Sequence, residues 1–103
     1  MSDANPEFDT VHPSGYILAR SCRGGYLHSV NISEAAMDVE ADDLARGIVL
    51  TAGVSHLKAL LEVRREIVAS GHTPSAQVPR QQDLDTAIEV LLDHRLRRRL
   101  SSD

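Results

Sequence analysis

The sequence predicts an α+β fold: a three-stranded antiparallel β-meander followed by one long helix and a C-terminal helix. Three observations predict it. Two β-rich runs flank Gly24 and Gly25, a long helical pattern runs from about Asp38 to Ser70, and a second apolar pattern follows Pro79. A chain of 103 residues fits one domain. We expect a flexible N-terminus over residues 1–6, a core over 7–71, a linker over 72–78 and a C-terminal helix with a basic tail over 79–103.

The hairpin joins residues 16–22 to residues 26–32. A two-residue turn with positive φ at both central positions favours glycine, which Gly24 and Gly25 supply. The resulting register pairs Ser21 with His28. It also puts four apolar residues on one core face: Ile17, Ala19, Val30 and Ile32. A third strand over residues 7–12 completes the expected meander.

The long helix begins near Asp38, which is a good N-cap residue. The carboxylates of Asp42 and Asp43 are favourable there, because they lie near the positive end of the helix dipole. The helix ends at Ser70, with Gly71 as its C′ residue. Residues 33–37 before it suit a short connection with one helical turn. Two glycines inside the helix, Gly47 and Gly53, indicate either close approach of a neighbouring helix or simple tolerance.

The length of this helix implies a partner surface. About thirty residues at ~1.5 Å per residue give a rod of roughly 45 Å, longer than a three-stranded sheet can cover. Its apolar residues also occupy more than one face. We therefore expect a homodimer. The candidate dimer or partner surface comprises Leu50, Val54, Leu57, Leu61 and Val68.

The second helix is expected from Pro79 or Gln81 to Leu100, and its end is strongly basic. Four arginines form the candidate contact with an anionic partner: Arg95, Arg97, Arg98 and Arg99. Alternatively, they complement the dipole at the C-terminus of the helix. The formal net charge of −4 disfavours a generally basic nucleic-acid binder.

No catalytic or metal-binding motif stands out in the sequence. The five histidines lack HxxxH spacing and there is no CxxC pair, so we expect no metal, no cofactor and no enzyme activity. The single Cys22 fits a reducing compartment. The sequence shows no signal peptide and no apolar run of membrane-spanning length, so we expect a cytoplasmic protein without membrane contact.

The stretches GYLHSVNIS and MDVEADDLARGIVLTAGVSHLKAL, following Phe8, Val11 and Pro13, resemble the YbaB/EbfC fold. Within it, the sequence is most similar to the actinobacterial EspD and EspH proteins that accompany type VII (ESX) secretion systems. The helix pattern that carries this similarity is Leu44-Ala45, Ile48 and Ala52. The resemblance covers residues 7–67. It departs from the family in lacking a long helix before the strands.

The resemblance implies a non-enzymatic accessory or chaperone-like protein of type VII secretion that acts by binding a protein partner. The alternative that it implies is a nucleoid-associated DNA-binding protein. A Tyr-x-x-x-Asp/Glu secretion signal is missing, because Arg20 follows Tyr16 and Val30 follows Tyr26 at that spacing. We therefore expect a helper of secretion and not a secreted effector.

Overall fold

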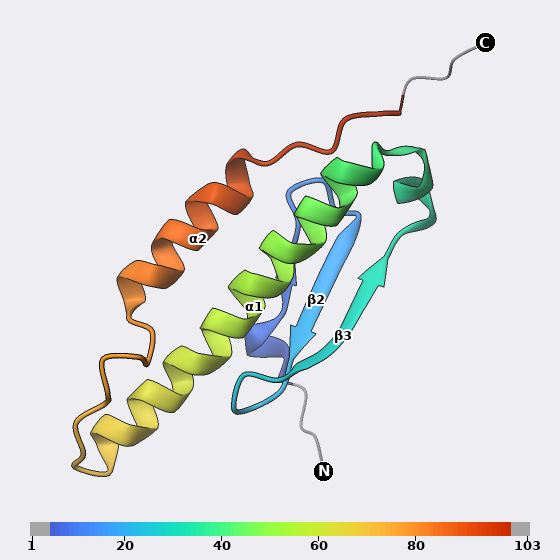
Figure 1. Ribbon diagram of the computed structural model, residues 1–103. Helices are drawn as coiled ribbons and strands as arrows, with labels where there is room; N and C mark the ends of the chain where they lie inside the picture. The colour runs from blue at the N-terminus through green and yellow to red at the C-terminus, as the bar shows by residue number, and fades with distance from the viewer. Residues whose placement is uncertain (1–4, 100–103) are drawn as a thin grey trace.

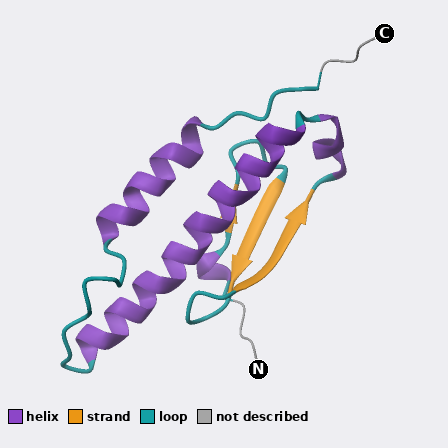
Figure 2. Ribbon diagram, in the orientation of Figure 1, coloured by secondary structure: helices purple, strands orange, loops and turns teal. Residues whose placement is uncertain are grey.

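The computed structural model describes residues 5–99. Its elements are the 3-10 helix η1 (Pro6–Phe8), the strands β1 (Thr10–Val11), β2 (Ile17–Ser21) and β3 (Leu27–Ile32), the 3-10 helix η2 (Glu34–Asp38), and the helices α1 (Ala41–Ala69) and α2 (Gln81–Asp93). The strands form one antiparallel sheet in the order β1-β2-β3 (Figure 1). The predicted class, a meander followed by a long helix and a C-terminal helix, is confirmed. Figure 2 shows α1 lying across the sheet, with α2 on the side of α1 away from β3.

The first strand is shorter than predicted. Residues 6–8 wind into η1, because the side chain of Asn5 accepts a hydrogen bond from the Glu7 N–H at 3.0 Å and caps the turn. Only Thr10 and Val11 pair with β2. The turn buries Phe8 beneath α1, so this segment contributes to the core through one aromatic side chain.

The hairpin follows the predicted register except near its turn. Ile17 pairs with Ile32, but Ser21 pairs with Leu27 and not with His28, because a bulge shifts the register after Arg20. The Gly25 N–H donates to the Cys22 carbonyl at 3.1 Å, so Arg23 and Gly24 are the central residues of the turn. Both glycines nevertheless have the predicted positive φ, 93° at Gly24 and 98° at Gly25.

The predicted core face holds on β2 but only in part on β3, where Val30 is half-buried. Ile17 and Ala19 are fully buried under α1, whereas Ile32 is 44% exposed. The difference follows from the strand order, because β2 is central while β3 is the edge strand. Apolar side chains of β3 therefore remain in contact with solvent.

Helix α1 begins three residues later than predicted. Asp38 closes η2, and Glu40 is the N-cap residue without a side-chain capping bond. Instead, the Glu40 N–H donates to the Arg97 carbonyl at 2.9 Å. The C-terminal end agrees with the prediction: the helix ends at Ala69, and Gly71 follows with φ 85°.

The two glycines in α1 differ in their surroundings. A Cβ on Gly47 would lie 3.0 Å from Ile17 Cδ1 and 3.2 Å from Leu96 Cδ2, whereas none of the described atoms lies within 4 Å of a Cβ on Gly53. Close approach therefore explains Gly47, although the neighbours are β2 and the chain after α2, not a second helix. Simple tolerance describes Gly53.

Helix α2 covers one side of α1. Leu84 and Leu91 pack against Val54 and Leu61 in one apolar cluster. The Arg80 N–H donates to the Asp83 carboxylate at 2.8 Å, which satisfies one free amide at the start of α2. This helix ends at Asp93, so the prediction of a helix to Leu100 is wrong across residues 94–99, and Leu100 itself lies outside the described residues.

Candidate functional site

Four of the five residues predicted as a dimer or partner surface are in the interior of the chain. Val54 and Leu61 are buried in the cluster with α2, and Leu50 and Leu57 pack at its margin. The sequence reasoning set α1 against the sheet alone and missed that α2 folds back over it. Only Val68 is exposed, at 57%. Val54 and Leu61 are therefore covered by their own chain, and Leu50 and Leu57 keep only part of their side chains in solvent.

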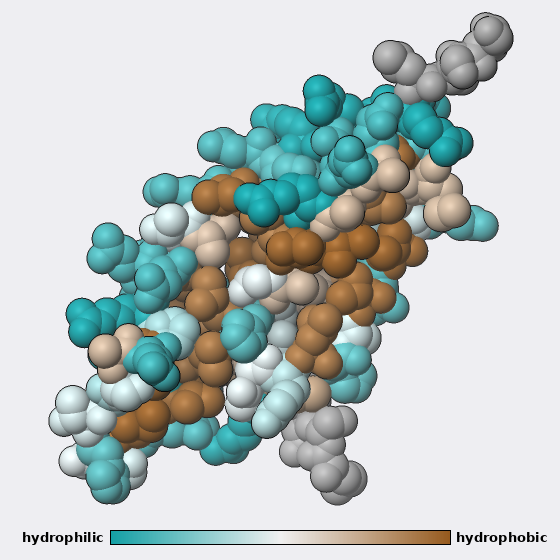
Figure 3. All heavy atoms as spheres, viewed as in Figure 1, coloured by the Kyte–Doolittle hydropathy of each residue, from teal (hydrophilic) through white to brown (hydrophobic). Residues whose placement is uncertain are grey.

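A different apolar surface lies where β3 and α1 meet. The exposed apolar side chains there are Leu27, at 51%, and Ile32 on β3, with Val49, at 62%, on α1. The helix contacts the start of β3 through His56, whose ring nitrogen Nδ1 lies 2.7 Å from the Gly25 carbonyl oxygen. Val49 lies seven residues before His56 and so on the same face of the helix. In Figure 3 hydrophobic atoms form a band over α1 and toward β3.

The outer edge of β3 adds backbone groups to this surface. β3 pairs with β2 on one side only, and none of the described segments pairs with its other side. Such an edge offers N–H and C=O groups to an added strand. No lysine or proline occurs between Leu27 and Ile32 to block an added strand. We call the open edge of β3 with Leu27, Ile32 and Val49 the β3/α1 surface.

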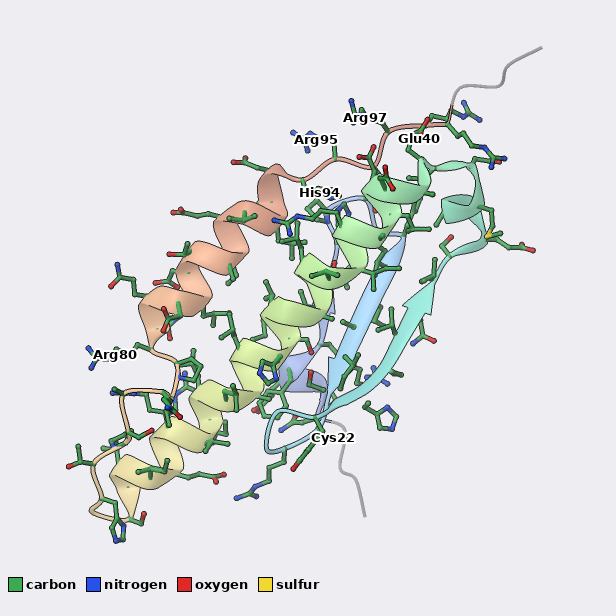
Figure 4. The ribbon with its side chains drawn as sticks, in the orientation of Figure 1. Cys22, Glu40, Arg80, His94, Arg95 and Arg97 are labelled. Atoms are coloured by element: carbon green, nitrogen blue, oxygen red, sulfur yellow. The ribbon has the colours of Figure 1, made fainter. Side chains whose placement is uncertain are left out.

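The four arginines predicted to contact an anionic partner lie beyond the last helix. Residues 94–99, which we call the C-terminal strap, run extended across the first turn of α1 (Figure 4). Val39 and Arg98 form an antiparallel bridge, and the Arg99 N–H donates to the Asp38 carbonyl at 2.7 Å. The interpretation of these arginines as a complement to the C-terminal dipole of α2 is therefore wrong. They lie at the N-terminal end of α1 instead.

The strap arginines have acidic neighbours from α1. Arg97 Nε lies 3.1 Å from the Asp43 carboxylate, and its backbone N–H donates to the same oxygen at 3.2 Å. The hydrogen bonds from Arg97 hold the pKa of Asp43 below its ordinary value. Arg98, Glu40 and Asp42 line one shallow hollow of about 360 Å³. In Figure 4 Arg95 points away from α1. Within the basic run, Arg97 is thus paired with a carboxylate of its own chain, and Arg98 shares a hollow with two others.

Sequence reasoning missed the buried polar groups that join the layers. Ser55 Oγ donates to the Phe8 carbonyl at 2.7 Å and lies 2.6 Å from Ser21 Oγ. His12, which is 1% exposed, lies with Nε2 2.9 Å from Nδ1 of His94. The one available signal was the pair Ser55-His56 inside an otherwise apolar stretch of helix. Neither histidine of the buried pair could be matched to the other from the sequence.

The described part of the chain contains no group of three His, Cys, Asp or Glu side chains placed to hold a metal. Cys22 is a buried thiol. The structure thus assigns no metal-ligand set between residues 5 and 99.

By length and composition α1 is apolar enough to cross a bilayer, which corrects the expectation that no run of that length exists. However, α1 packs on β2 with one face and on α2 with another. That is the environment of the central helix in a globular domain, and such helices pass the same test.

The fold and surface together define a small α+β domain with an open strand edge beside an apolar helix face. The chain belongs to the family described as "Protein of unknown function (DUF2694)", whose model matches residues 1–97. It is similar to "Uncharacterized protein Rv0028" of Mycobacterium tuberculosis (strain ATCC 25618 / H37Rv) and "Uncharacterized protein Mb0029" of Mycobacterium bovis (strain ATCC BAA-935 / AF2122/97). Each is 73% identical over 99 residues, which cover 96% of this chain and 98% of the relative. No solved structure matches the chain.

Proposed function

We propose that the protein is a non-enzymatic, chaperone-like accessory protein of type VII secretion that acts in the cytoplasm by binding protein. The observation that carries the binding role is the β3/α1 surface. Leu27, Ile32 and Val49 each leave much of an apolar side chain in solvent. Apolar groups gathered on one side of a small domain are typical of a surface that binds another protein.

The backbone geometry suggests how a partner would bind. An extended segment added to β3 would satisfy its free amides and carbonyls, and its side chains would cover Ile32 and Leu27 on the α1 side. A second copy of this chain meets both needs, because β3 can pair with itself antiparallel about a twofold axis. We therefore propose a homodimer through this surface, with a secretion partner bound by the assembled dimer.

Type VII secretion enters through the sequence resemblance, and the mycobacterial relatives fit the actinobacterial branch of that resemblance. The alternative role in DNA binding receives less support. Arg97 is paired with Asp43, and Glu40 and Asp42 line the same hollow as Arg98, so acidic side chains lie among these arginines. Repulsion between these groups and a nucleic-acid backbone disfavours that role.

The experiment is a comparison of secreted proteins in a strain lacking the gene. We expect the strain to lose one or more type VII substrates from the culture medium, and the wild-type gene to restore them. Val49→Asp should fail to restore them, because a carboxylate would have to be buried at the interface. Val90→Asp is the matched control, since Val90 is an exposed valine on α2, outside the β3/α1 surface.

An unchanged set of secreted proteins in the deletion strain would contradict the secretion role. Restoration by Val49→Asp as complete as by Val90→Asp would contradict the role of the surface. Both variants should reach comparable cellular levels, because substitutions at exposed positions of this kind usually change the free energy of unfolding by less than about 0.5 kcal/mol.

A further inference from the structure

The histidine pair joins the two chain segments that meet over α1. His12 lies in the turn after β1, and His94 is the first residue of the C-terminal strap. Their rings meet edge to face with centroids 5.2 Å apart, and His12 Nε2 is 2.9 Å from His94 Nδ1. His12 is 1% exposed and His94 is half-buried. This hydrogen bond spans 82 positions of the sequence.

Ser14 fixes which nitrogen of His12 carries the proton. The Ser14 backbone N–H donates to His12 Nδ1 at 3.0 Å, so this nitrogen is an acceptor. Ser14 Oγ, which accepts from the Tyr16 N–H, lies 2.9 Å from the same nitrogen and can donate its own hydrogen to it. In neutral His12 the proton is therefore on Nε2, and Nε2 donates to His94 Nδ1.

This arrangement tolerates no proton on His94 Nδ1. A proton from solvent at that atom would place two N–H groups against each other at the closest point of the two rings. A proton on His12 Nδ1 would likewise oppose the Ser14 N–H. The bond between the two rings thus requires a neutral His94, and the contact with Ser14 favours a neutral His12.

The strap makes further contacts after His94. Leu96 packs over Gly47. The backbone carbonyl of Arg97 accepts a hydrogen bond from the Glu40 N–H at 2.9 Å, and the Arg99 N–H donates to the Asp38 carbonyl. Arg97 also pairs with Asp43. Leu96 and Arg98 of the strap, with Val39, line a hollow of about 320 Å³.

We propose that His12 and His94 form a pH-sensitive latch: the strap is closed over α1 while His94 Nδ1 accepts the hydrogen bond from His12, and it is released when a proton occupies that nitrogen. The charged groups around the pair come from three elements. Asp43 of α1 faces His94, Arg95 and Arg97 lie on the strap, and Asp93 ends α2. The turn after β1 contributes only the Ser14 hydroxyl and amide, which are neutral.

The buried partner supports this role. Burial, and then the charge of a protonated His94, lower the pKa of His12 below its ordinary value of 6.5. Its neutral form is therefore the form that the fold favours. The sign follows from linkage: this stabilisation is complete above about pH 6.5 and is lost as the pH falls toward the lowered value.

The test is amide hydrogen exchange of the intact protein, measured by NMR at pH 7.5 and pH 5.5 and divided by intrinsic rates. The Glu40 and Arg99 amides report the strap, because each donates across it. We expect their protection to fall about tenfold or more at pH 5.5, since one pH unit changes a protonation ratio tenfold. The Cys22 amide, bonded to Tyr26 at the far end of the sheet, should stay protected.

Two variants separate the latch from other acid effects. In His94→Asn the amide oxygen can accept from His12 Nε2–H but cannot titrate, so strap protection should be equal at both pH values. His72→Gln removes an exposed histidine beyond α1 and should behave like wild type. If the strap amides of His94→Asn show low protection at both pH values, the result would also support the latch. It would mean that the hydrogen bond between His12 and His94 is what holds the strap. Unchanged wild-type protection at pH 5.5, or the same fall in His94→Asn, would overturn the proposal.

Discussion

The hydroxyl groups of Ser21 on β2 and Ser55 on α1 lie 2.6 Å apart in the fully buried layer between sheet and helix. Ser55 uses its only hydroxyl hydrogen on the Phe8 carbonyl, so Ser21 must donate to Ser55. Two consecutive hydrogen bonds thus link β2, α1 and η1. All three groups are satisfied without water, and they fix the position of the helix along the sheet.

Removing the Ser55 hydroxyl, which is the middle group of these hydrogen bonds, should lower the stability of the protein. Ser55→Ala leaves the Ser21 hydroxyl without its acceptor, and it leaves the Phe8 carbonyl with only a long 3.5 Å contact from the Thr10 hydroxyl. We expect the free energy of unfolding to fall by about 1–3 kcal/mol. Adding Ser21→Ala to that variant should cost little more, because its hydroxyl has already lost its partner. Urea denaturation measures both. Ser75→Ala, in the exposed segment between the helices, is the control, and equal stability of the Ser55 and Ser75 variants would contradict this account.

The two glycines of α1 should respond in opposite directions to alanine. Gly53→Ala meets none of the described atoms within 4 Å and should stabilise the protein by about 1 kcal/mol, the difference in helix propensity. Gly47→Ala gains the same propensity but presses on Ile17 and Leu96, so it should show no gain or a loss. Thermal unfolding of the two variants checks this, and equal stabilisation would show that the contact at Gly47 relaxes freely.

The basic strap should not bind duplex DNA measurably at physiological salt. Arg97 is neutralised by Asp43, and the neighbouring carboxylates oppose phosphate. The measurement is fluorescence anisotropy with labelled duplex over a salt series, for wild type and for the triple variant Arg97→Gln, Arg98→Gln and Arg99→Gln. Micromolar binding that weakens steeply with salt and disappears in the triple variant would favour the nucleoid-associated role.

Local signals in the sequence were enough to predict the order of the elements. Glycine at the hairpin turn and Gly71 at the end of α1 each mark a backbone position with positive φ, and both positions are confirmed. The bounds that were wrong depend on distant contacts. α1 starts at Ala41, where the Glu40 N–H finds its acceptor in Arg97, far along the chain. Local propensity contains no information about such a partner.

The candidate site was predicted less well for the same reason. Helical spacing correctly identified Val54 and Leu61 as residues that need an apolar partner, but spacing cannot say whether that partner is a second chain or α2. Periodicity also placed Ile32 in the core, because it does not reveal which strand lies at the edge of the sheet. The pairing of His12 with His94 could be found only from the folded chain.

The most direct test of the binding role of the β3/α1 surface is the mass of the protein in solution. We predict that light scattering at micromolar concentration gives about twice 11.3 kDa for wild type and for Val90→Asp. Val49→Asp should give about 11.3 kDa while keeping the circular dichroism of the wild type. A wild-type mass of 11.3 kDa, or a dimer that Val49→Asp leaves intact, would contradict the account.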